Sequence, residues 1–362
     1  MSKTIVNNNI KLKSGGGIIN DATDGLSVEF WNYFGDGSDG DVTISVDTTL
    51  SADKYYNNLT INNGVTLNPG GYRIYVAGIL TNNGTIARNG NDGTAGTAAT
   101  TTSGGAKGIG GAALASGTIY GGLAGVDGVD GVTRTGDGVT NGNPGVSGTS
   151  LNPSITGISG LAGTDGGGGS TYGKGGAGGA GGTATPESSL FGPKNIFGIL
   201  NTEITTNITY VLKGLSSLDV LSTSATNGGA GSGGIHMYNS TSGSCSSGGS
   251  GGSGGNAGIV YIQAKSIVNN GVISAIGGKG GAGSTGWDGT TKGYTQIGGS
   301  AGGSGGNGGL VVLIYSSLTG SGSISVLGGT GGAGANGTGT SPKPAGAGTN
   351  GNNGKYIKIL LS

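Results

Sequence analysis

The stretch that decides the fold is GSGGNAGIVYIQAKSIVNNGVISAIGGKGGAG, residues 252–283. It recurs without a gap as GSGGNGGLVVLIYSSLTGSGSISVLGGTGGAG, residues 303–334. Many of the aligned positions are identical, and others exchange one apolar residue for another, as Ile262 does for Leu313. A duplication of this kind indicates a repeat architecture in which each copy packs on its neighbour.

Further partial copies flank this pair. One begins at Gly351 and contains a single strand, and another begins at Tyr72 near the N-terminus. In the latter, the turn sequence Asn82-Asn83-Gly84 matches Asn269-Asn270-Gly271. The same turn sequence also occurs at Asn62. Strand-turn-strand units repeated in this way predict stacked, solenoid-like coils.

Each copy joins two kinds of local structure. The apolar residues are rich in β-branched side chains and fall in short runs bounded by Gly and Asn, which predicts strands and positive-φ turns. The glycine tracts have a period of three, as in GGSGGSGGNAG at 248–258. The polyproline-II helix also has three residues per turn and forms no internal hydrogen bonds. In a GGx repeat, two of the three residues in each turn have no side chain, so neighbouring backbones can come close enough to form hydrogen bonds.

The expected fold is therefore mostly β with polyglycine-II helices, in which solenoid-like short strands alternate with stacked GGx tracts and there is essentially no α-helix. The alternative for any one tract is a flexible Gly/Ser linker. Recurrence of the tracts at fixed places beside apolar strands favours the ordered structure.

Composition excludes several classes of function. The chain has 17 basic and 17 acidic residues among 362, so its net charge is zero and it lacks the basic patch that nucleic-acid binding needs. One Cys excludes a disulfide framework and any zinc site made of cysteines. No apolar run approaches the ~18 residues of a membrane-spanning helix. The start of the chain lacks the apolar stretch of a secretory signal, so we expect synthesis in a cytoplasm.

Composition also changes along the chain and suggests five regions. They are an attachment segment at 1–34, a solenoid-like strand domain at 35–90, a glycine-rich polyglycine-II region at 91–185, a β insert at 186–225, and the duplicated strand and GGx domain at 226–362.

The GGxGGx tracts joined by short segments resemble the adhesins at the tips of T-even-type phage long tail fibres. That resemblance implies a lattice of polyglycine-II helices whose distal loops recognise a bacterial surface receptor. Residues 34–45 and 55–86 are similar to a segment common in phage and prophage virion proteins. The chain departs from the adhesins in its strand content, its duplication and its long N-terminal region.

The segments that join tract ends without being duplicated are the candidate receptor-binding loops. They lie at 235–247, 284–297 and 335–350. Aromatic side chains have no room inside a GGx lattice, and exposed Trp and Tyr stack on sugars and dominate interfaces. The alternative is that these residues cap the lattice or contact sister subunits. The candidates are His236, Tyr238, Trp287, Asp288, Lys292 and Tyr294.

Residues near the N-terminus are candidates for two other roles. The aromatic cluster of Trp31, Tyr33 and Phe34 is a candidate for attachment to the virion, or it is a packing cluster at the start of the solenoid. Asp36, Asp39 and Asp41 could offer oxygen ligands to Ca²⁺, although Asp-Gly turns explain the pattern equally well. We predict no bound metal.

No catalytic constellation or cofactor motif is predicted. His236 is the only histidine, and no nucleophile-elbow sequence accompanies it. We therefore expect a non-enzymatic virion-surface protein, a tail fibre or fibre-tip adhesin. Its expected partners are a bacterial receptor (an outer-membrane protein or a glycan) and other virion proteins, and analogy with phage fibres favours a homotrimer.

Two alternative functions remain open at this point. One is a structural capsid or virion-surface fibre or decoration protein without receptor specificity. The other is a glycine-rich ice-binding or bacterial surface protein, and a flat, regular array of threonines would favour ice binding.

Overall fold

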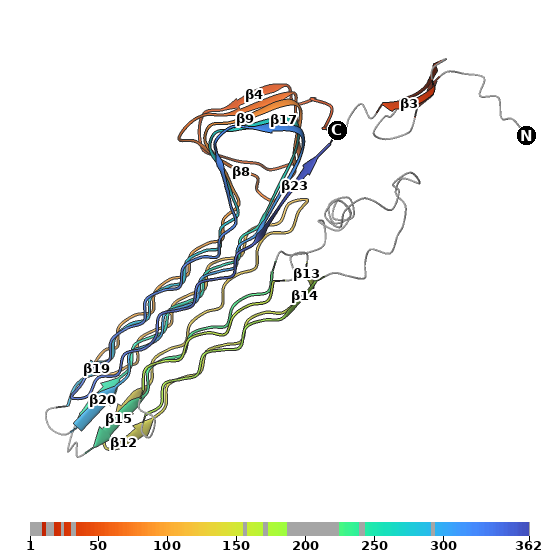
Figure 1. Cartoon of the computed structure of the whole chain (residues 1–362). Coiled ribbons are helices and arrows are strands. Elements are labelled where there is room, and N and C mark those ends of the chain that lie inside the picture. Colours follow the sequence, from red (N-terminus) through yellow and green to blue (C-terminus); the bar gives the residue numbers. More distant parts are fainter. Residues whose placement is uncertain are drawn as a thin grey trace, which may run out of the picture.

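The computed structural model describes residues 9–11, 18–22, 25–29, 34–154, 158–168, 173–186, 224–238, 243–290 and 294–361. The molecule is elongated (Figure 1). A head of stacked strands lies at one end, a bundle of extended glycine tracts leaves it, and a tip of short strands closes the far end. Within these ranges every regular element is a strand and there is no helix, so the mostly-β prediction is confirmed.

The head consists of two sheets in which all pairs of strands are parallel. In spatial order, the first contains β23 (Lys355–Leu360), β21 (Leu310–Thr319), β17 (Ile259–Asn269), β9 (Ile74–Asn82), β7 (Asn58–Ile61) and β4 (Asp41–Ile44), with β6 (Lys54–Tyr56) also paired to β9. The second contains β22 (Ser323–Ser325), β18 (Val272–Ser274), β10 (Thr85–Ala87), β8 (Thr66–Asn68) and β5 (Thr48–Thr49). We call one strand of the first sheet together with the following strand of the second a layer.

The strand register confirms the repeat alignment. Leu310 lies beside Ile259, and Leu318 lies beside Ile267, so the two copies stack in the register that the sequence gives them. Asn82 lies beside Asn269, as the matching turn sequences predict. Since β9 pairs with β17, the regions 35–90 and 226–362 share both sheets. Between β10 and β17 the described chain runs back and forth along the bundle more than once, because the tract at 104–111 is antiparallel both to the tract at 94–97 and to the tract at 125–131.

The head has an apolar interior because alternate residues of each strand point inward. In the first sheet, neighbouring strands place equivalent apolar residues side by side in a row, which we call a file. One buried file across β7, β9 and β17 consists of Leu59, Leu80 and Ile267. Leu67, Ile86 and Ile273 form the corresponding buried file of the second sheet. A second apolar cluster lies on the other face of the first sheet and contains Ile119, Ile259, Tyr261, Leu310, Val312, Ile314 and Ile359.

The glycine tracts pair through backbone hydrogen bonds at every third residue. The N–H groups of Gly278 and Gly281 donate to the carbonyls of Gly255 and Gly252, at 2.9 and 2.8 Å. The residue number of the acceptor falls as that of the donor rises, so these two tracts run antiparallel. On another side of the same tract, Gly277 and Gly280 donate to residues 327 and 330, so that neighbour runs parallel.

The centre of the bundle is polar. The tracts at 224–234, 247–258 and 297–309 are buried throughout. Their third residues are small, and their side chains hydrogen-bond to the next tract: Ser250 Oγ donates to the carbonyl of Ala230 at 2.9 Å, and Ser253 Oγ to that of Gly228 at 3.2 Å. Short hydroxyl side chains thus occupy the space between tracts and satisfy backbone acceptors there.

Candidate functional site

The tip is built from two antiparallel three-stranded sheets at the end of the bundle opposite the head (Figure 1). One sheet contains β12 (Gly138–Thr140), β15 (Ile235–Tyr238) and β20 (Tyr294–Ile297). The other contains β11 (Thr133–Thr135), β16 (Ser244–Ser246) and β19 (Trp287–Asp288). A buried cluster of Ile235, Met237, Cys245 and Ile297 combines residues from both sheets.

The first of these sheets carries an aromatic surface on its outer face. In β15, His236 and Tyr238 alternate with the buried Ile235 and Met237. Tyr238 lies directly opposite Tyr294 on β20. The ring of His236 meets that of Tyr294 edge-on, with 5.8 Å between ring centroids. Tyr238 is 61% exposed and Tyr294 41%, so both rings are open to a partner.

The carboxylate of Asp288 is engaged in hydrogen bonds within the tip. Its carboxylate accepts hydrogen bonds of 2.7 Å from both the Thr295 and the Thr290 hydroxyls, and one of 3.4 Å from the Cys245 thiol. Burial alone would raise the pKa of Asp288, but these hydrogen bonds hold it below its usual value. Asp288 therefore joins β16, β19 and β20, and its position is that of a structural residue.

Cys245 is correspondingly unreactive. Burial raises the pKa of its thiol to about 12, and the nearby Asp288 charge adds to the shift. Because the thiolate is the nucleophilic form, the protonated side chain serves the core of the tip rather than chemistry.

The indole ring of Trp287 lies against the nearby Gly289. A Cβ atom added at Gly289 would overlap the indole ring, so the ring covers the bare backbone of that glycine. Trp287 is half-buried and belongs to the second sheet, where it pairs with Ser246. The structure thus places His236, Tyr238 and Tyr294 on one surface and Trp287 with Asp288 on the neighbouring sheet. Lys292 lies outside the described residues.

The turn between β11 and β12 adds residues that the sequence did not single out. The Arg134 guanidinium donates to the carbonyls of Gly136 and Val139, at 3.2 and 3.3 Å, and so holds the turn. Val139 is 40% exposed and lies directly opposite His236, which extends the aromatic surface with an aliphatic side chain. The Gly-Asp-Gly sequence at 136–138 is the one signal that could have indicated this turn.

The three N-terminal aspartates separate into different contacts. Asp36 accepts a hydrogen bond from the Ser38 N–H, and Asp39 accepts one from the Tyr55 N–H. Asp41 accepts hydrogen bonds from the side chains of Asn57 and Asn58. No cluster of three or more His, Cys, Asp or Glu side chains suited to a metal occurs in the part of the chain that the structure describes.

The predicted attachment cluster is visible only in part. Trp31 and Tyr33 lie outside the described residues, and Phe34 is half-buried at the start of the head.

Among the residues described, none belongs to a helix with the length and apolar character needed to cross a membrane. Comparisons with protein-family models, curated proteins and solved structures found no match.

Proposed function

We propose that this protein is a non-enzymatic adhesin of a bacteriophage virion, a tail fibre or fibre tip, which binds a bacterial surface receptor through the outer face of its tip. The observation that carries the proposal is the exposure of Tyr238 and Tyr294, paired side by side, at the far end of a long bundle. Tyr rings combine a large apolar face with a polar hydroxyl, which suits both glycan and protein partners.

The proposal includes the finer architecture. We infer that the glycine tracts are polyglycine-II helices and that the head is a solenoid. Hydrogen bonds at every third residue, as from Gly303 to Gly281 and from Gly306 to Gly278, support the first inference. Parallel pairing in a constant register through β17, β21 and β23 supports the second.

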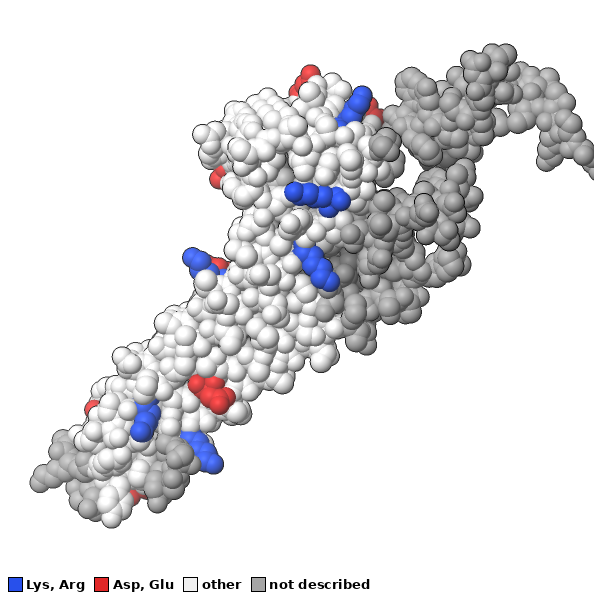
Figure 2. Space-filling view, in the orientation of Figure 1, with Lys and Arg blue, Asp and Glu red and all other residues white. Residues whose placement is uncertain are grey.

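A rigid support explains how such a tip would bind. Neighbouring tracts restrain one another along the bundle, so little conformational entropy remains to be lost on association. Figure 2 shows charged side chains only as isolated spots on the face in view, with long uncharged stretches between them. Recognition by the tip would therefore depend on aromatic contact and hydrogen bonds more than on charge.

The two alternatives make different demands on the structure. For ice binding, Thr43, Thr60 and Thr81 do form one file across β4, β7 and β9. The neighbouring file contains Asn58 and Ile79 instead, so the face is not a regular threonine array. A structural virion component would need no exposed aromatic pair at the tip. Homotrimer formation and attachment to other virion proteins on the virion surface remain part of the proposal by analogy.

The deciding experiment is adsorption to cells. The purified protein is incubated with a panel of bacterial strains, and both bound protein and inhibition of phage infection are measured. We expect adsorption to susceptible strains and protection of them from infection. If the protein neither adsorbs nor protects, yet occurs on virions at a capsid-like copy number, it is a structural component and the adhesin proposal is wrong.

A further inference from the structure

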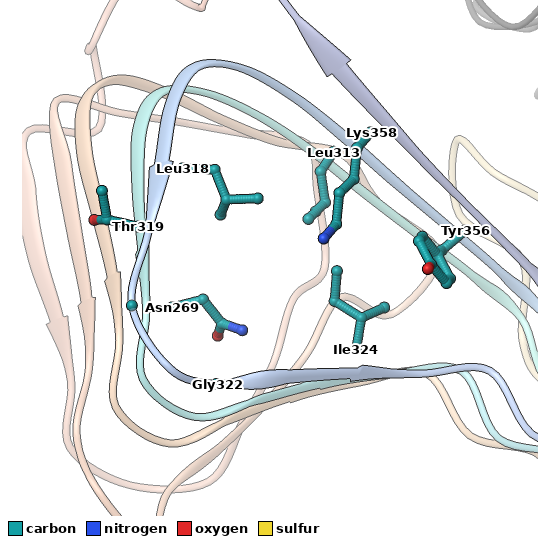
Figure 3. Close-up of a pocket in the computed structure, with 9 residues that line it drawn as sticks. Asn269, Leu313, Leu318, Thr319, Gly322, Ile324, Tyr356 and Lys358 are labelled. Carbon is teal, nitrogen blue, oxygen red and sulfur yellow. The ribbon is translucent and has the colours of Figure 1, made fainter.

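Three corners of the head carry the same turn sequence, Asn-Asn-Gly, at 62–64, 82–84 and 269–271. Each corner joins a strand of the first sheet to the following strand of the second sheet, β7 to β8, β9 to β10 and β17 to β18. In Figure 3 the corners of successive layers overlie one another at the place marked by Asn269 and Gly322. The same three residues therefore occur at equivalent places in three layers, where their surroundings can be compared.

An asparagine followed by glycine can lose ammonia in a reaction that consumes only water. The glycine nitrogen gives its proton to solvent base and attacks the side-chain carbonyl carbon of the asparagine. The new N–Cγ bond closes a cyclic imide, while the Cγ–Nδ2 bond breaks and the nitrogen takes up a proton and leaves as ammonia. Water then opens the imide at Cγ to give aspartate, or at the backbone carbonyl to give isoaspartate. The attack needs a side chain and a glycine N–H that are free to approach each other.

Stacking holds both groups at the two later corners. The side-chain amide of Asn270 donates to the side-chain oxygen of Asn83 at 2.9 Å, so each of these side chains restrains the other. The N–H of Gly271 donates to the carbonyl of Asn82 at 2.9 Å, and Gly84 is buried. Imide formation at either corner must first break or uncover these groups, which adds to its barrier.

The corner at Asn62 instead closes on itself. The N–H of Val65 donates to the carbonyl of Asn62 at 3.2 Å, which makes a β-turn with Gly64 at a φ of 76°. Asn62, Asn63 and Gly64 are all exposed. Among the residues that the structure describes, none hydrogen-bonds to the Asn63 side chain or to the N–H of Gly64. A Cβ atom added at Gly64 would meet nothing within 4 Å, so the space beside this backbone is open.

The neighbouring layers explain why this turn is not covered. The N–H groups of Asn83 and Thr85 donate to the carbonyls of Ile61 and Val65, at 3.0 and 2.9 Å, and so pass over the turn between them. The corner of the preceding layer, at 45–47, has the sequence Ser-Val-Asp and offers no asparagine to pair with the turn. The side-chain pairing that restrains the later corners is therefore missing here.

We propose that Asn63 is a site of spontaneous modification, at which the Gly64 nitrogen closes the imide and water opens it to aspartate and isoaspartate. Stacking protects Asn83 and Asn270 from the same reaction. The product places a carboxylate on a corner of a chain whose net charge is otherwise zero. Its isoaspartate form also lengthens the backbone link between β7 and β8 by one methylene group. The site lies in the head and does not depend on what the tip binds.

The test follows the whole protein during incubation in mildly alkaline buffer. Samples are digested, and mass spectrometry measures the conversion of amide to acid in the peptides that contain Asn63, Asn83 and Asn270. Labelling by an isoaspartyl methyltransferase reports the isoaspartate. The same protein unfolded in urea gives the intrinsic rate of each peptide, and incubation continues until the unfolded sample has reacted at all three. The matched variant is Asn63→Gln, whose longer side chain must close a larger and slower-forming ring.

We expect Asn63 to react about tenfold faster than Asn83 and Asn270 in the folded protein, and the three rates to converge in urea. The Asn63→Gln protein should keep its melting temperature, because the site is exposed, and should lose the modification of this peptide. Equal rates at the three corners of the folded protein overturn the proposal. So does a folded protein in which Asn63 stays intact while the unfolded sample reacts, or a signal in this peptide that persists in Asn63→Gln.

Discussion

The side-chain amide of Asn82 donates a hydrogen bond of 2.7 Å to the side-chain oxygen of Asn269, 187 residues further along the chain. Both side chains are buried inside the head, where β9 pairs with β17. Asn82 also donates to the carbonyl of Val272 at 3.3 Å. A buried polar pair of this kind fixes the register, because a slip of one residue would leave both amides without partners.

Replacing either member of this pair should destabilise the head. Asn82→Ala and Asn269→Ala each leave a buried polar group without its partner, at a cost of about 1–3 kcal/mol of unfolding free energy. The double variant should cost less than the sum of the two, because the second change removes the group that the first left unpaired. Chemical denaturation of the four proteins measures both effects.

A second asparagine pair in the same chain serves as the control for this double-mutant cycle. Asn270 donates to Asn83 at 2.9 Å, in the same two turns but at an exposed site. Asn83→Ala and Asn270→Ala should each change stability by no more than about 0.5 kcal/mol. If the variants of the buried and exposed pairs lose equal amounts of unfolding free energy, the Asn82–Asn269 hydrogen bond does not stabilise the pairing of β9 with β17.

The glycines of the bundle should be irreplaceable at two positions in three. A Cβ atom at Gly329 would overlap the carbonyl oxygen of Gly278 in the neighbouring tract. Gly329→Ala should therefore force tracts apart and cost about 1–3 kcal/mol. Thr330 is the exposed third residue of the same triplet, so Thr330→Ala should be almost neutral. Thermal unfolding of the two variants distinguishes a packed lattice from a loose linker, in which both changes would be tolerated.

Much of the strand arrangement could be predicted from the sequence because the repeats impose their own register. The alignment of Ile262 with Leu313, and of Asn82 with Asn269, appears directly as neighbouring residues in the head. Stacked repeats place equivalent residues in contact, so sequence similarity becomes spatial proximity.

The tip was less predictable because its strands depend on pairing over long distances. Thr133–Thr135 contains two β-branched residues but is too short to predict a strand by itself, and it forms one by pairing with Ser244–Ser246 far along the chain. The aromatic candidates could be chosen from the sequence as residues that do not fit a glycine lattice. Tyr238 and Tyr294 share a face of the sheet, whereas the carboxylate of Asp288 is engaged in hydrogen bonds. Both facts depend on tertiary contacts that no local sequence pattern encodes.

Acid should weaken the tip through Asp288. Hydrogen bonds keep the pKa of this carboxyl below the ordinary value of 3.8, so its contribution to stability is complete above that value. The contribution is lost as the pH falls through the lower pKa of the folded protein. Asp288→Asn cannot titrate, so wild-type protein should be more stable than the variant at pH 7, and the difference should shrink below pH 3.8. A difference that stays constant down to strong acid would contradict this role.

Removing the exposed tyrosines of the tip should reduce adsorption without affecting the fold. Tyr238→Ala and Tyr294→Ala each remove a large ring from the centre of the proposed contact surface, where truncation of an aromatic residue commonly costs 2 kcal/mol or more. We expect at least a tenfold loss of affinity for cells, with little change in melting temperature, because both rings are exposed. The control is Tyr120→Ala, since this ring is 44% exposed and follows Ile119, whose N–H donates to Gly71 of the head. If all three variants adsorb like the wild type, the aromatic surface is not the contact, and the neighbouring sheet with Trp287 becomes the next to test.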